Sequence, residues 1–150
     1  MNPKQLEMIK EDCSRIFRDP DRFSALKNES VLITGGTGFM GSWLVEAIAY
    51  LNDQHGFGTK LTLVARDIDR FNQNQPHLAS RSDISFIEKS VRDLIDIPGD
   101  VSWIIHAAGT PDNRAHSSNP LDVIDSIANG TMQVLDASTR LSNLKKIVNI

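Results

Sequence analysis

The sequence contains a single cysteine and no long hydrophobic run. Cys13 cannot form a disulfide within the chain, which is typical of proteins from reducing compartments. No apolar stretch approaches the ~20 residues that a membrane-spanning helix needs. Glu7, Glu11 and Asp12 interrupt the amino terminus, where a secretory signal peptide requires an apolar segment. We therefore expect a cytoplasmic protein with no membrane partner.

An excess of charge of either sign is also absent. The net charge is −3 and no basic run stands out, which argues against broad nucleic-acid binding. A hydrophobic content of 40% and a charged content of 23% are ordinary for one globular domain and exclude disorder, collagen and coiled coil. His55, His77 and His116 have no metal-ligand spacing with one another or with Cys13, so no metal site is predicted.

Residues 1–29 are predicted to form an amino-terminal helical extension. Apolar residues recur there at helical spacing, with charges between them, at Leu6, Ile9, Cys13, Ile16 and Phe17. The Asp-Pro-Asp stretch at 19–21 should end this helix. Cys13 is expected to be a buried small residue rather than a reactive thiol. The helix could cover one edge of a sheet or contact a second subunit, and a plain covering role is the simpler interpretation.

Residues 30–150 alternate between short apolar runs and helical patterns. Apolar runs predict strands at 31–34, 61–65, 84–88, 101–106 and 146–150. Helical spacing predicts helices at 40–51 and 120–141, whereas 67–83 is expected to be loop with short helical pieces and 110–119 a polar loop. This alternation predicts an α/β fold, a Rossmann-type doubly wound parallel sheet of about five strands in the order 3-2-1-4-5.

Three glycines spaced three apart follow the first strand, and a helical pattern follows them at once. One glycine permits the tight turn, a second lets a phosphate approach the backbone, and the third lets the helix pack on the sheet. The amino end of the helix then presents unbonded N–H groups to the negative charge. The sequence therefore predicts a dinucleotide pyrophosphate site formed by Gly35, Gly38 and Gly41 with the N–H groups of Phe39 and Met40.

The stretch Thr-Gly-Gly-Thr-Gly-Phe-Met-Gly at 34–41 resembles the cofactor loop of the extended short-chain dehydrogenase/reductases, the NAD-dependent epimerases and dehydratases of nucleotide sugars. The stretch His-Ala-Ala-Gly at 106–109 is similar to a second signature of that family. The resemblance implies that Ala107, Ala108 and Gly109 line the cofactor. It covers residues 30–150, which are thus expected to form an NAD(P)-binding Rossmann domain.

The end of the second predicted strand, Val-Ala-Arg-Asp at 64–67, bears on the choice of cofactor. A carboxylate there would accept hydrogen bonds from the ribose of NAD, whereas an arginine would pair with the 2′-phosphate of NADP. Ala65 stands where NAD-specific relatives carry their acid, and Arg66 follows it, which favours NADP. Two alternatives stay open, because Asp67 could turn to the ribose and Arg66 could be a solvated residue.

The resemblance assigns the adenine to Ser90 and Val91, where relatives carry an acid followed by an aliphatic residue. The Ser90 hydroxyl can still accept a hydrogen bond from the adenine amine. Asp93 could compensate for the missing acid, but capping the next helix is its simpler role. His106 is expected to be a buried, hydrogen-bonded histidine rather than a base. Gly130, in the middle of a helix, predicts close packing on the sheet or the cofactor.

Family members continue past the fifth strand to a Tyr-x-x-x-Lys motif, and this sequence ends at Ile150 without one. The only tyrosine, Tyr50, has Gln54 four residues on. The catalytic residues are therefore unknown. We expect the cofactor-binding half of an NAD(P)-dependent nucleotide-sugar epimerase or dehydratase, a homodimer as the full-length parent, with the substrate domain absent and no turnover by the chain alone. The alternative is a non-catalytic NAD(P)-binding sensor.

Overall fold

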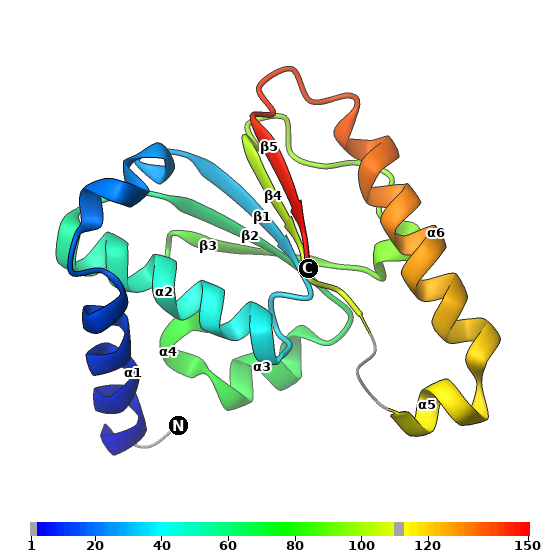
Figure 1. Cartoon of the computed structure of the whole chain (residues 1–150), viewed down its shortest axis with the longest axis horizontal. Coiled ribbons are helices and arrows are strands. Elements are labelled where there is room, and N and C mark those ends of the chain that lie inside the picture. Colours follow the sequence, from blue (N-terminus) through cyan, green and yellow to red (C-terminus); the bar gives the residue numbers. More distant parts are fainter. Residues whose placement is uncertain (1–2, 110–112) are drawn as a thin grey trace.

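Five parallel strands form one sheet in the computed structural model, which describes residues 3–109 and 113–150 (Figure 1). The strand order is β3-β2-β1-β4-β5, which confirms the predicted Rossmann-type order. β1 lies at the centre, where Val31 pairs with Leu61 on one side and Trp103 on the other. The strands are β1 (Ser30–Thr34), β2 (Lys60–Ala65), β3 (Ile84–Glu88), β4 (Trp103–His106) and β5 (Lys146–Asn149).

The predicted helices are present, and the structure adds others. The α-helices are α1 (Pro3–Ile16), α2 (Phe39–His55), α3 (Ile68–Asn74), α4 (Pro76–Ala79), α5 (Asn113–Ser118) and α6 (Pro120–Ser138). Two 3₁₀ helices, η1 (Pro20–Leu26) and η2 (Val91–Asp93), were not predicted from the sequence. The prediction of a polar loop at 110–119 is wrong over 113–118, which are helical, and 110–112 lie outside the described residues.

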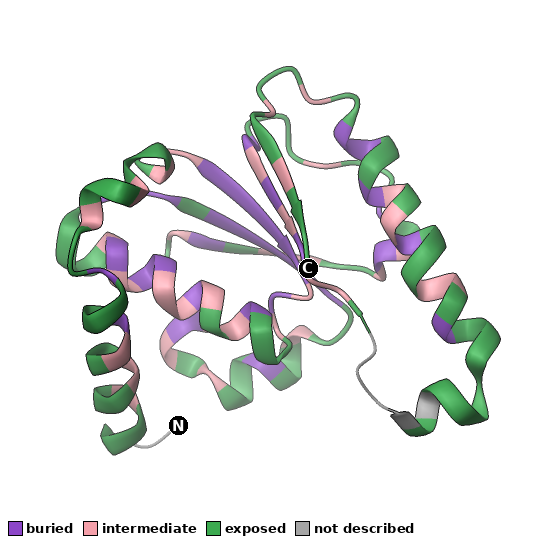
Figure 2. Cartoon of the chain, in the orientation of Figure 1, coloured by how far each residue is buried: buried purple, intermediate pink, exposed green. Residues whose placement is uncertain are grey.

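The two faces of the sheet are covered by different helices (Figure 1). On β1, Val31 and Ile33 pack with α2, α3 and α4, whereas Leu32 packs with η2 and α6 on the opposite face. This division follows from the alternation of side chains along a strand. Figure 2 shows the resulting core, with the buried residues along the central strands and on the helix sides that face them.

The amino-terminal extension packs against α2. Cys13 and Phe17 form a small apolar cluster with Leu51 and Phe57, and Phe17 and Phe23 meet edge to face at 4.8 Å between ring centroids. Cys13 is only 1% exposed, as predicted. Burial, together with the nearby carboxylates, raises the pKa of the Cys13 thiol to about 11. The thiol therefore stays protonated at neutral pH and acts as a packing residue.

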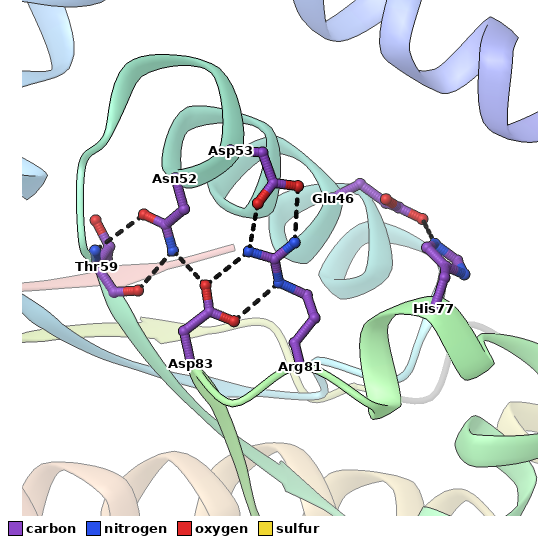
Figure 3. Close-up of polar contacts among 7 residues, drawn as sticks. All are labelled: Glu46, Asn52, Asp53, Thr59, His77, Arg81 and Asp83. Carbon is purple, nitrogen blue, oxygen red and sulfur yellow. Dashed lines mark hydrogen bonds and ion pairs between the residues drawn. The ribbon is translucent and has the colours of Figure 1, made fainter.

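A network of polar side chains joins the carboxyl end of α2 to the strands beside it (Figure 3). Arg81 donates two hydrogen bonds of 2.8 Å to the Asp53 carboxylate and further bonds of 2.8 and 2.7 Å to Asp83. Asn52 donates to Asp83 and also pairs with the backbone of Thr59. The network fixes α2 relative to the starts of β2 and β3, at the edge of the sheet opposite the strand ends considered next.

The helix α6 buries a narrow side and exposes a broad apolar one. Val123, Gly130, Val134 and Ala137 face the sheet. The apolar residues whose spacing predicts the helix lie instead on its outer face, defined here as Leu121, Ile124, Ile127, Met132 and Leu135, all of them exposed. The sequence thus predicts the helix but not the side on which it packs.

Candidate dinucleotide site

A cleft of about 170 Å³ opens at the carboxyl ends of β1, β2 and β4. In open α/β sheets this is the edge where ligands bind. Eight of the predicted site residues line it: Gly35, Gly38, Arg66, Ser90, Val91, Ala107, Ala108 and Gly109. The fold therefore brings together loops that are far apart in the sequence. Thr37 and Lys89 also line the cleft, and the sequence analysis did not single them out.

Gly35 and Gly41 are needed because the protein itself fills the space of a side chain. Gly35 has φ of +69°, and a Cβ there would lie 2.6 Å from the Ala107 carbonyl oxygen. A Cβ at Gly41 would overlap the Gly35 carbonyl and lie 2.6 Å from the Gly36 Cα. These contacts press the glycine loop against the end of β4 and against the first turn of α2.

Gly38 differs from its two neighbours in the motif. Its φ of −80° is accessible to any residue, and a Cβ there would meet one protein atom within 4 Å, the Gly35 carbonyl oxygen at 3.2 Å. The protein therefore constrains Gly38 less than Gly35 and Gly41, through one tight contact with a backbone oxygen, and leaves the absence of a side chain only partly explained. A ligand that must approach the backbone closely does account for it, so the loop fits a bound pyrophosphate.

Gly38 also caps α2, and it does so without a side chain. The first bond of the helix runs from the Ser42 N–H to the Gly38 carbonyl oxygen, at 2.9 Å. The N–H groups of Phe39, Met40 and Gly41 consequently have no acceptor within the helix. The Phe39 side chain is 78% exposed and lies outside the cleft, as does that of Met40. The backbone N–H groups of both residues are thus placed as donors for an anion would be at the amino end of a helix.

The carboxylates near the end of β2 are both used to cap α3. Asp67 accepts a hydrogen bond from the Arg70 N–H at 2.9 Å, and Glu88 accepts one from the Ile68 N–H at 3.3 Å. The alternative in which Asp67 turns to a ribose is therefore not the arrangement found. Arg66 is exposed at the rim of the cleft, where its guanidinium can reach a ligand.

Ser90, and not Asp93, begins the helical turn that follows β3. The Ser90 hydroxyl accepts a hydrogen bond from the Arg92 N–H at 3.3 Å, and Asp93 is the last residue of η2. The expectation that Asp93 caps the next helix is wrong. The helical turn η2 begins at Val91, so the capping position before it belongs to Ser90, and Asp93 lies at the other end of the turn. Arg92 anchors this turn to α6 through ion pairs with Asp122 and Asp125, at 2.8 and 2.9 Å.

Val91 is held in the cleft wall by α6. A Cβ at Gly130 would lie 2.8 Å from Val91 Cγ2, so the glycine permits α6 to pack closely against η2. Gly130 is closely packed, but its partner is η2 and not the sheet or the cofactor that the sequence predicted. Ser126, one turn before Gly130, also lines the cleft.

His106 supports the cleft wall without entering it. Its Nδ1 lies 2.6 Å from Thr34 Oγ1 and its Nε2 lies 3.1 Å from Thr131 Oγ1. Because the Thr131 hydroxyl donates to the Ile127 carbonyl, it must accept from Nε2–H, which leaves Nδ1 to accept from Thr34. Thr34 Oγ1 in turn accepts from the Ala108 N–H.

The imidazole of His106 is consequently neutral. Burial lowers its pKa below the ordinary value for histidine, and the side chain is 3% exposed. The prediction of a buried, hydrogen-bonded histidine is confirmed.

Several sequence expectations do not bear on the cleft. Arg114 and His116 are exposed on α5 and are not among the cleft residues. No group of three His, Cys, Asp or Glu side chains within 3–109 and 113–150 is arranged to hold a metal ion. Among the described helices, none combines the length and apolar character needed to cross a bilayer.

The fold is similar to that of several solved structures. The enzyme WbmF from Bordetella bronchiseptica, in complex with NAD⁺ and UDP, is 25% identical with a TM-score of 0.68, over 84% of this chain and 36% of that one. The epimerase Mth375 from Methanothermobacter thermautotrophicus is 21% identical with a TM-score of 0.71, over 86% of this chain and 37% of that one.

A third structure is the UDP-glucuronic acid 4-epimerase from Bacillus cereus, in complex with UDP-glucuronic acid and NAD. It is 22% identical with a TM-score of 0.65, over 80% of this chain and 39% of that one. The chain thus spans well under half the length of these proteins. A comparison with curated proteins gives no match.

Residues 31–150 match the sequence model of the NAD dependent epimerase/dehydratase family, which is most of the chain and all of the sheet except its first residue, Ser30. The glycine loop, the strand order and the cleft at the strand ends agree with that match. The chain belongs to the NAD-dependent epimerase/dehydratase family.

Proposed function

We propose that this chain binds NAD(P) in the cleft and forms the cofactor-binding half of a nucleotide-sugar epimerase or dehydratase. The observation that carries the proposal is Gly38, which lines the cleft with ordinary backbone angles and has only one protein atom, at 3.2 Å, near the position of a side chain. The unbonded N–H groups of Phe39 and Met40 beside it would hold the pyrophosphate.

The other cleft residues have distinct roles in this proposal. Ser90 and Val91 would hold the adenine, and the small residues Ala107, Ala108 and Gly109 would allow the cofactor to lie against the end of β4. The nicotinamide, when bound, supplies a hydride acceptor for a sugar carbon. The chain itself contains no Tyr-x-x-x-Lys motif, so residues 1–150 would bind cofactor without turnover.

The arrangement around β2 favours NADP over NAD. A ribose hydroxyl needs an acceptor at the end of this strand, but Ala65 offers none, and the carboxylates of Asp67 and Glu88 are engaged by α3. Arg66 at the rim would pair with a 2′-phosphate. WbmF and the Bacillus cereus epimerase were solved with NAD, so the preference would be a property of this chain.

The substrate class and the partner follow from the same family. UDP is bound to WbmF and UDP-glucuronic acid to the Bacillus cereus epimerase, which supports a nucleotide sugar as substrate. We propose a homodimer for the full-length parent, supported by the exposed apolar outer face of α6. A protonated, buried Cys13 is compatible with the reducing cytoplasm as its location.

Titration calorimetry of the purified protein with NAD and with NADP tests the cofactor site. Gly38→Val places a branched side chain where the phosphates must approach, so both affinities should collapse. Gly99→Val is the matched control, because a side chain there meets no atom within 4 Å. Unchanged cofactor affinities in Gly38→Val would refute the site.

The preference for NADP is tested by Arg66→Ala. A charge-assisted contact to phosphate is worth about 1.5–3 kcal/mol, so NADP should bind roughly 10- to 100-fold more weakly while NAD changes little. If the NADP affinity is unaffected, Arg66 is a solvated residue and NAD becomes the favoured cofactor.

A sensor without turnover is the second candidate, because a cleft that binds NAD(P) would serve a sensor as well as an enzyme. Both candidates predict binding, so the discriminating measurement is catalysis by the full-length parent. Following the absorbance of the reduced cofactor in the presence of UDP-sugars separates them. Turnover by residues 1–150 alone would contradict both the sensor and the proposed division of the enzyme.

A further inference from the structure

A second cleft, of about 510 Å³, lies beside the cofactor cleft and borders α3. The two clefts share Thr37, Gly38 and Arg66, so they form one continuous hollow that extends past the end of β2. The second cleft adds Arg70, together with Phe71 and the end of α3, to the residues within reach of a ligand.

Arg66 and Arg70 are the cations of the second cleft, and Asp67 is its acid. The Asp67 carboxylate caps α3 by accepting the Arg70 N–H, so its charge is directed at the helix backbone. Within the part of the chain that the structure describes, neither arginine side chain makes a hydrogen bond or an ion pair. Two guanidinium groups thus face the same hollow with their donors available.

The helix that carries Arg70 is fixed in place. Its first turn is capped by Asp67 and Glu88, and its one buried residue, Phe71, meets Phe86 of β3 edge to face at 5.6 Å between ring centroids. The backbone of Arg70 therefore keeps its position relative to β2. An arginine on an anchored helix is suited to bind a ligand at a defined place.

We propose that Arg70 is a second specificity-determining residue, which binds the 2′-phosphate of NADP together with Arg66. This inference rests on the proposed function of the cofactor cleft. A phosphate monoester carries nearly two negative charges at neutral pH, and two guanidinium groups match that charge with directed donors. Arg66 alone would leave part of the charge unpaired, and the acids nearby are committed to α3.

Affinities of the purified protein for NADP and NAD, measured by calorimetry, test the proposal. Arg70→Ala should weaken NADP by ~10-fold and leave NAD unchanged, since NAD lacks the 2′-phosphate. Arg70→Lys, which keeps the charge but loses the planar fork, should lie between the wild type and Arg70→Ala. The matched control is Arg18→Ala, an exposed arginine of the amino-terminal extension that lines neither cleft.

The proposed cofactor site and the proposed role of Arg70 are refuted by different results. If the wild type binds neither NAD nor NADP, the proposed function is wrong. If the wild type binds NADP but Arg70→Ala behaves like Arg18→Ala, the role of Arg70 is wrong and the cofactor site stands. An equal loss of NAD and NADP in Arg70→Ala would also overturn it, because the residue would then act on the fold of the cleft. Lys89→Ala gives a further check, since Lys89 lines only the cofactor cleft and should not reproduce the Arg70 effect.

Discussion

Thr34 of β1 and His106 of β4 are paired in the sheet, and Thr34 Oγ1 lies 2.6 Å from His106 Nδ1. Thr34 donates to the imidazole and accepts from the Ala108 N–H, so the neutral histidine orients the threonine that supports the cleft wall. Protonation of His106 would place two donors against each other. The shape of the cofactor cleft is therefore linked to the charge of a residue outside it.

This link predicts a loss of stability in mild acid. Burial lowers the pKa of His106 in the folded chain. At pH values between this lowered pKa and the ordinary pKa of histidine, the unfolded chain therefore binds more protons than the folded one. The free energy of unfolding should fall as the pH drops below about 6.5, the ordinary pKa of histidine. Urea denaturation at a series of pH values, with wild type and His106→Asn, isolates the effect. Parallel pH profiles for the two proteins would show that His106 does not titrate as inferred.

Gly35→Ala should destabilise the fold by roughly 2–4 kcal/mol, the sum of a left-handed backbone and an overlap with the Ala107 carbonyl. The matched variant is Gly56→Ala, which has a similar φ of +62° and no atom within 4 Å of the added carbon. It should cost only about 1 kcal/mol. Denaturation midpoints measure both. Equal losses of stability in the two variants would mean that the glycine loop moves away from Ala107 at little cost and that its contact with β4 is loose.

Asp67→Ala should destabilise α3 by about 0.5–2 kcal/mol through the loss of its cap, whereas Asp67→Asn should retain most of that stability. Neither variant should weaken NAD or NADP, because the carboxylate serves the helix. Urea denaturation and cofactor titration test the two statements separately. A selective loss of NAD affinity would instead assign Asp67 to the ribose.

Asp83→Asn should lower the free energy of unfolding by about 1–3 kcal/mol at neutral pH, since it removes charge-assisted bonds from Arg81. Arg81 holds the pKa of Asp83 below its usual range. Because its folded-state pKa is lowered, the ionised Asp83 stabilises the fold at pH values above ~3.9, the ordinary pKa of aspartate. This contribution to the free energy of unfolding is lost as the pH falls below that value.

The difference between wild type and Asp83→Asn should consequently narrow below about pH 4. Asp69→Asn, at an exposed position of α3, is the control and should be near neutral at every pH. A difference that is constant with pH would mean that Asp83 acts through its shape and not its charge.

Local sequence determined the elements that border the cleft. The apolar runs at 31–34 and 61–65 can be buried only as strands, and the glycines after the first run permit a turn that other residues cannot make. Handedness rules then allow few strand orders, which is why 3-2-1-4-5 was predictable. The glycine loop was predictable for a similar reason, because its whole geometry lies within one short segment.

Contacts between distant segments could not be predicted in this way. Nothing near Arg81 in the sequence indicates that it pairs with Asp53, 28 residues away. By sequence the Asp67 carboxylate was open to a ribose, and only the packing of α3 shows that it caps this helix together with Glu88. Likewise, helical spacing in α6 showed an apolar stripe, but the helix buries a different side, on which Gly130 packs against Val91 of η2.

The sequence by itself therefore determined the α/β alternation, the strand order and the position of the glycine loop, since backbone angles and side-chain periodicity are local properties. Only the tertiary structure decided that His106 is neutral, that Asp67 faces a helix and that Arg70 shares a hollow with Arg66. Those features depend on which groups are desolvated together, and desolvation depends on segments that meet only when the chain is folded.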